Sequence, residues 1–127
     1  MFKMHRMLIV LPLLALTACE SKPPAEVSRE QLADVRQTHA AIEVGSDRDE
    51  VLKAFESGNK VKLGSSVLGD AHLEEWKVEA FHDEDKRKDL FVTFLYFCNE
   101  KFVDSSDTRI NYRDNAEIVD RWTSGVK

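Results

Sequence analysis

The sequence predicts an α+β fold in which two N-terminal helices pack on a three-stranded antiparallel sheet and a short helix ends the chain. Three observations support this. Residues 29–55 carry apolar side chains at helical spacing, residues 72–103 show the alternation and aromatic content of strands, and residues 114–122 return to helical spacing. Because helices and strands occupy separate stretches, we expect helices laid on one face of the sheet.

Two helices open the predicted domain. Ser28 and Gln31 fit a capping box, which predicts a helix over 29–43 that Gly45 terminates. Ser46 is expected to cap a second helix that ends at 57–59, with an apolar stripe of Val51, Leu52 and Phe55. His39 falls on the apolar side of the first helix, where a packed, hydrogen-bonded imidazole is expected rather than a ligand.

The strands follow. Residues 60–71 contain two glycines and two serines and predict a loop or an irregular edge. Residues 72–81 alternate like a half-buried strand, residues 82–89 form a charged loop, and residues 90–98 are the strongest strand. A compact turn at 99–101 leads into a third strand that begins with Phe102 and Val103.

The chain is expected to end in a short helix. Residues 114–117 give a second capping pattern, and the apolar positions that follow are Ile118, Val119 and Trp122. This helix bears on an unusual property of the strand over 90–98, whose two faces are both apolar. One face carries Leu90, Val92, Phe94, Tyr96 and Cys98, and the other carries Phe91, Thr93, Leu95 and Phe97.

With helices on one side only, the second sheet face needs a cover. One interpretation is that the C-terminal helix closes over Phe91, Leu95 and Phe97. The alternative is that a partner protein or a second copy of the chain binds this face.

The first 18 residues have the order of a secretory signal. A positive segment with Lys3 and Arg6 precedes the apolar run Met7–Leu16, whose ten residues fall short of the roughly 20 that span a bilayer. A plain secreted protein with a cysteine at its start is one interpretation. However, the sequence Leu16, Thr17, Ala18, Cys19 resembles the lipobox of bacterial lipoproteins at all four positions.

The lipobox resemblance implies that residues 1–18 are a signal peptide and that Cys19 carries the lipid anchor. Two or three acyl chains make such an attachment effectively permanent. In this class an aspartate after the cysteine favours inner-membrane retention, so Glu20 indicates an outer-membrane protein facing the periplasm. Residues 19–27, with Pro23 and Pro24, then form a tether, and residues 28–127 form a single domain.

The charge argues against nucleic-acid binding. The formal net charge is −5, and it becomes −7 when residues 1–18, with two basic and no acidic residues, are removed. The field then has the wrong sign for phosphate backbones. An acidic surface of this size serves solubility or attracts a basic protein.

No catalytic, metal or cofactor site is expected. Once Cys19 is lipidated, Cys98 is the sole thiol, and its apolar neighbours predict a packed side chain. The runs 72–75 and 82–85 each combine one histidine with carboxylates. Neither run is expected to supply the three or four ligands in fixed geometry that a zinc site needs. Motifs for nucleophile elbows, zinc proteases and phosphate loops are missing from the sequence.

Residues 40–104 resemble the SmpA/OmlA family, the small BamE-like lipoproteins. The resemblance rests on the lipobox and tether, on residues 42–46 opening a helix, on Glu75 and Trp76 in a strand, and on Phe94 followed by residues 99–102 at a hairpin. It implies a layout of two helices and three strands and a role in assembling outer-membrane β-barrels.

The functional hypothesis is therefore a membrane-tethered, protein-binding lipoprotein of the cell envelope, active in assembly or maintenance. Anchoring would hold it beside membrane-bound partners and make weak contacts effective. The alternative hypothesis is a lipoprotein inhibitor that uses its acidic surface against a basic protein such as a lytic enzyme.

Overall fold

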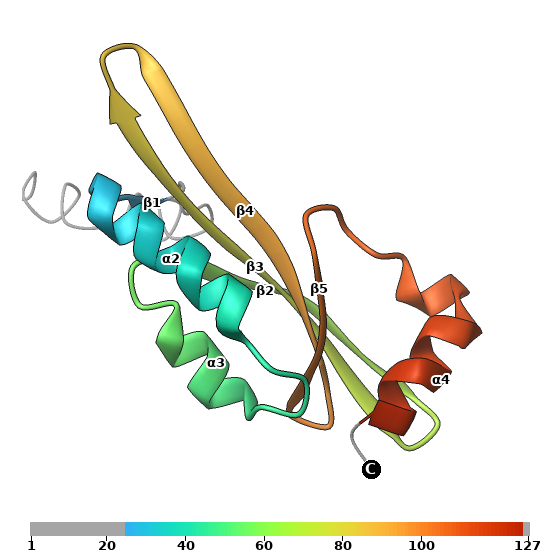
Figure 1. The fold of residues 1–127 in the computed structure, drawn as a ribbon. Helices are drawn as coiled ribbons and strands as arrows, with labels where there is room; N and C mark the ends of the chain where they lie inside the picture. The colour runs from blue at the N-terminus through green and yellow to red at the C-terminus, as the bar shows by residue number, and fades with distance from the viewer. Residues whose placement is uncertain (1–24, 126–127) are drawn as a thin grey trace, which may run out of the picture.

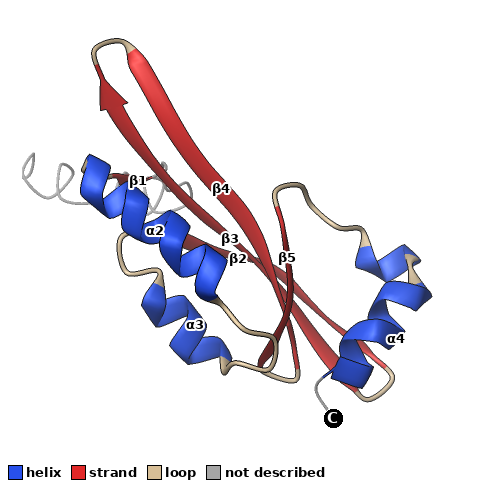
Figure 2. Cartoon of the chain, in the orientation of Figure 1, coloured by secondary structure: helices blue, strands red, loops and turns tan. Residues whose placement is uncertain are grey.

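Helices lie on both sides of a twisted five-stranded sheet in the computed structural model, which describes residues 25–125 (Figures 1 and 2). The α+β class is confirmed. The signal peptide, Leu16, Thr17, Ala18 and Cys19 lie outside the described residues. In chain order the elements are β1 (Ala25–Glu26), α2 (Arg29–Ala41), α3 (Arg48–Ala54), β2 (Asn59–Leu68), β3 (Ala71–Glu84), β4 (Arg87–Cys98), β5 (Lys101–Ser106), the 3₁₀ helix η1 (Tyr112–Asp114) and α4 (Ala116–Gly125).

The sheet is mixed and larger than predicted. Strands β2, β3, β4 and β5 are antiparallel neighbours, and β1 runs parallel to β3 beyond the start of β2. In β1, Ala25 pairs with Ala80 and Glu26 with Phe81, and the amide of Val27 donates to the carbonyl of Phe81 (2.8 Å). The last three residues of the predicted tether are therefore held on the sheet, before the predicted boundary at residue 28.

Strand β2 replaces the loop or irregular edge expected over 60–71. All ten of its residues are half-buried or exposed, and its register with β3 shifts between Lys62 and Gly64, as at a β-bulge. Val61 and Leu63 alternate with lysines, but Gly64, Ser65 and Ser66 interrupt that short pattern, so pairing with β3 rather than the sequence pattern reveals the strand. Gly69, with φ of +63°, turns the chain into β3.

The charged loop predicted over 82–89 is instead the end of a long hairpin. β3 continues to Glu84, β4 begins at Arg87, and Asp85 and Lys86 form a two-residue turn with φ of 47° and 66°. Opposite charges face each other across the strands, Asp83 opposite Lys88 and Glu84 opposite Arg87. We call residues 78–93, the part of this hairpin beyond the reach of β5, the arm. It projects past the rest of the sheet (Figure 1).

The predicted helices form with small shifts at their ends. The capping box of Ser28 and Gln31 is confirmed, and α2 ends at Ala41 rather than 43. Helix α3 is capped by Asp47 rather than Ser46, because residues 45–48 pair with the start of β5: the amide of Phe102 donates to the carbonyl of Ser46 (2.8 Å). At α4, the side chain of Asn115 accepts from the amide of Ile118 (3.2 Å), one residue later than predicted.

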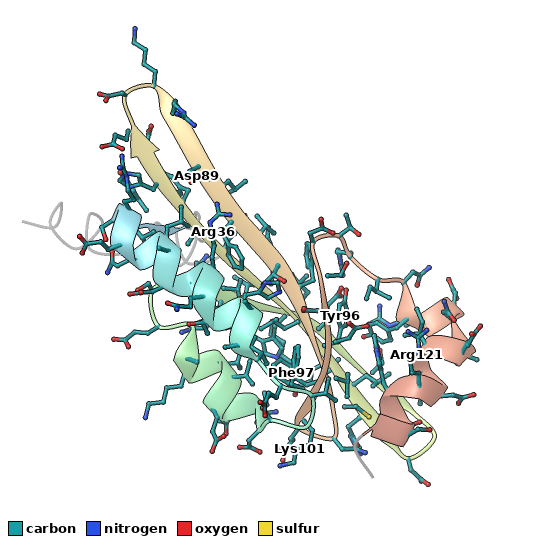
Figure 3. All side chains as sticks on the ribbon, in the orientation of Figure 1. Arg36, Asp89, Tyr96, Phe97, Lys101 and Arg121 are labelled. Atoms are coloured by element: carbon teal, nitrogen blue, oxygen red, sulfur yellow. The ribbon has the colours of Figure 1, made fainter. Side chains whose placement is uncertain are left out.

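One sheet face packs against α2 and α3, and we call it the helix-pair face. Phe91, Leu95 and Phe97 lie here, all buried by the chain itself. Figure 3 shows Phe97 on the side of these helices and Arg36 reaching from α2 to Asp89 on the arm. The cluster also contains Val27, Leu32, Val35, Val51, Phe55, Val78, Ala80 and Phe102.

The opposite face packs against η1 and α4, and we call it the tail face. Trp122 and Tyr112 close over Tyr96, whose ring stacks on Trp122 at 5.1 Å between centroids. The C-terminal helix does cover a second apolar face, but its predicted contact with Phe91, Leu95 and Phe97 is wrong. Strand alternation shows which side chains share a face of the sheet. It does not show which helix covers which face, because the helix positions depend on the path of the chain after β5.

Candidate functional site

The tail face is longer than the helix that covers it. Helix α4 covers the part of the tail face next to the β4–β5 turn. Beyond α4 the face continues along the arm and along the neighbouring part of β2. The apolar side chains left there are Val61, Phe81, Leu90, Val92 and Phe94, and we call this surface the distal face. Leu90 is 49% exposed and the other four are half-buried.

The register explains how these side chains gather. Phe81 lies opposite Leu90, and Lys77 opposite both Phe94 and Val61, so residues from three strands share one face. Phe94 also touches the cluster under α4. The distal face therefore continues the core of the tail face without a break, and residues 25–125 leave the side of the arm away from α2 open to contact.

The charges on the distal face are compensated locally. The ammonium of Lys77 lies 3.2 Å from a carboxylate oxygen of Glu79, and that of Lys88 lies 4.5 Å from the ring centroid of Phe81. An apolar surface with its charges already satisfied is suited to bind an apolar protein surface.

A histidine and a serine lie in contact near the base of the arm. The sequence did not predict this contact. Nε2 of His39 lies 3.1 Å from Oγ of Ser105 and 3.3 Å from Oγ1 of Thr93. The hydroxyl of Thr93 donates to the carbonyl of Ser106 (3.4 Å), and its oxygen can accept from His39 in the tautomer that carries the proton on Nε2. In that tautomer Nε2 has no lone pair for a serine proton. Burial lowers the pKa of His39, in keeping with a neutral structural imidazole.

The second polar cluster joins the β5–η1 connection to the sheet. Tyr96 donates to buried Glu75 (2.8 Å) and accepts from the amide of Ile110 (2.7 Å), and Arg109 binds the same carboxylate (2.7 and 3.2 Å). Burial alone raises the pKa of Glu75, but the hydrogen bonds from Arg109 and Tyr96 outweigh it and lower that pKa. Burial raises the pKa of Tyr96. These groups hold one another in place.

The histidine-containing runs do not converge into metal sites. His82 donates from Nδ1 to the carbonyl of Val27 (2.9 Å), and Asp83 points to the opposite face of the strand. Glu74 binds Arg48, Lys62 and Trp76. Within residues 25–125, no group of three or more histidine, cysteine or acidic side chains is placed to hold a metal ion. Cys98 is buried, which raises the pKa of its thiol.

Comparison with protein families, with curated proteins and with solved structures finds no match to this chain. Among residues 25–125, no helix is long and apolar enough to cross a membrane. The candidate site therefore stands on the geometry of the distal face.

Proposed function

We propose that the chain is a lipoprotein of the cell envelope, anchored through Cys19, that acts as a protein-binding module in envelope assembly or maintenance. The anchor rests on the sequence of the leader and its four-residue lipobox. The mature protein would face the periplasm, with the outer membrane favoured by Glu20.

The position of β1 implies a short distance between the proposed lipid anchor and the sheet. Residue 25 is held on β3, so five residues, 20–24, lie between it and Cys19, and the two Cα atoms are at most about 20–22 Å apart. A module held this close to a bilayer meets membrane-bound partners at high effective concentration. Its contacts need only modest intrinsic affinity.

The observation that supports protein binding is the uncovered distal face. Large apolar side chains lie next to one another on three strands, and because they are already partly buried, each would gain part of the about 1.5–3 kcal/mol that full burial of an exposed side chain provides. An apolar partner surface provides that burial. The SmpA/OmlA-like layout is part of the same proposal: helices α2 and α3 precede the antiparallel strands β3, β4 and β5, and β2 adds one more strand between α3 and β3.

In-cell photo-crosslinking tests this proposal. A photoreactive residue is placed at Phe81 or at Val61 of the full-length chain, and at exposed Val67 (62% exposed) as the matched control. We expect both distal-face positions, and not the control, to capture the same envelope protein. The proposal fails if the distal-face positions capture nothing, or if position 67 captures the same protein equally well.

A further inference from the structure

We propose that the outer edge of β4 along the arm pairs with the same edge of a second copy of this chain, in antiparallel register centred on Leu90. This inference goes beyond the proposed function, because it concerns the edge of the sheet and requires neither the anchor nor the partner. It rests on the main chain of residues 87–93 and on the side chains that flank it.

The edge is open because β5 is short. β5 pairs only with residues 94–98 of β4, so among the described residues no strand lies beside residues 87–93. Figure 1 shows the arm standing clear of β5 on this side. The register with β3 is unbroken from Leu73 to Glu84, so this edge is regular and has no bulge.

The two-residue turn determines which backbone groups face outward. In such a hairpin Glu84 and Arg87 exchange hydrogen bonds, so the odd-numbered residues of the arm in β4 bond to β3. The amides and carbonyls of Lys88, Leu90 and Val92 then point away from β3. The same alternation directs the groups of Phe94, Tyr96 and Cys98 toward β5, as their pairing requires.

The edges at β5 and β2 are protected. Residues 45–48 cover the start of β5 through hydrogen bonds with Phe102 and Glu100, and the carboxylate of Asp104 accepts from the amide of Ser105 (2.8 Å). β2 carries a register shift together with Lys60 and Lys62, features that discourage pairing. The outer edge of β4 lacks such protection over residues 90–93.

The edge is complementary to itself. Pairing centred on Leu90 sets Lys88 opposite Val92 of the second copy, Arg87 opposite its Thr93, and Asp89 opposite its Phe91. No two like charges lie directly opposite each other, and Asp89 is already bound by Arg36 (2.8 Å). The outward groups of three residues in each copy form about six main-chain hydrogen bonds.

Pairing also enlarges the distal face. Leu90, 49% exposed in one copy, lies beside Leu90 of the second copy, and all even-numbered β4 side chains remain on one side of the joined sheet. Two distal faces then form one continuous apolar surface. A closed, isologous two-fold contact of this kind leaves no further copy of this edge free to extend the assembly.

Cysteine crosslinking in intact cells tests the pairing on the full-length chain. Leu90→Cys is treated with a short bis-maleimide and compared with Val67→Cys, an apolar position on β2 that is more exposed (62% against 49%); both variants retain Cys19 and Cys98. We expect a species of doubled mass from Leu90→Cys and little or none from Val67→Cys. Absence of that species, or equal yield from the two variants, overturns the proposal.

Residue-resolved amide exchange supplies a second measurement on the mature chain in detergent micelles. On raising the protein concentration, the amides of Lys88, Leu90 and Val92 should slow at least about tenfold, while those of Arg87, Asp89 and Phe91, bonded to β3, should change little. Leu90→Pro, which removes an outward donor, should abolish the slowing and retain the fold. Exchange that does not depend on concentration contradicts the pairing. A missing crosslink at Phe81 contradicts only the proposed function.

Discussion

At the scale of single residues, Tyr96 joins the sheet to the chain segment that covers the tail face. Its hydroxyl bonds both Glu75 on β3 and the amide of Ile110 ahead of η1, and its ring stacks on Trp122 of α4. None of this could be predicted from the sequence, where Glu75 looks like one of many surface acids. A buried carboxylate becomes recognisable only once Arg109, 34 positions away, is seen to bind it.

Tyr96→Phe should lower the free energy of unfolding by about 1–3 kcal/mol, because it leaves the amide of Ile110 without its acceptor and takes a donor from Glu75. Urea denaturation measures the loss. The matched control is Tyr112→Phe, whose hydroxyl lies 3.5 Å from Oγ of Ser66 and should matter less. Equal losses from the two variants would contradict the special role of Tyr96.

His39 should make stability fall in mild acid. Burial lowers its pKa in the folded state, so the folded protein disfavours the charged form that the unfolded chain accepts. The stability held by neutral His39 is complete above the unfolded pKa of about 6.5 and is lost as the pH falls through the lower folded pKa. His39→Gln should flatten the decline in unfolding free energy between about pH 7 and 5. An unchanged slope would refute this assignment.

At the scale of elements, local signals predicted the helices and the inner strands well. The capping box at Ser28 and the apolar run over 90–98 specify α2 and β4 from neighbouring residues alone. β2 and the tip of the arm were not predicted, because glycine and serines interrupt the alternation in β2 and the side chains at the tip are charged. Their strand pairing comes from register with β3, and from a turn in which Asp85 and Lys86 adopt positive φ without glycine.

Trp122 is the side chain through which α4 covers the tail face. Trp122→Ala should cost about 3–5 kcal/mol of unfolding free energy, because it opens a cavity beside Tyr96 and Tyr112. It should also speed the reaction of buried Cys98 with a thiol reagent. Exposed Arg121→Ala, on the same helix, should leave both measurements nearly unchanged. If Cys98 reacts equally slowly in both variants, α4 does not shield it.

At the scale of the whole molecule, the two sheet faces differ in how completely the described residues cover them. The helix-pair face is filled by the chain itself, whereas the tail face is filled over one half and open over the other. Sequence patterns alone predict that Phe91, Leu95 and Phe97 lie under the C-terminal helix or a partner, because strand alternation separates the two faces without showing which helix covers which. The distal face uses Leu90, Val92 and Phe94 from the other face of β4, and strand pairing places Phe81 and Val61 beside them.

Salt should separate apolar docking from attraction by acidic surface charge. Because the charges on the distal face are compensated, photo-crosslinking from Phe81 should persist between about 50 and 500 mM salt in membrane preparations, although the Debye length shrinks about threefold. A steep loss of capture over that range would favour the inhibitor hypothesis, in which a net charge of −7 attracts a basic protein.

The central claim is that lipid holds this module at a membrane through Cys19, and the intact mass of the mature protein from cell membranes tests it most directly. The account predicts a chain that begins at Cys19 and carries acyl groups, and a Cys19→Ser variant that leaves the membrane fraction. An unmodified mass, or a variant retained in that fraction as firmly as the parent, would contradict it.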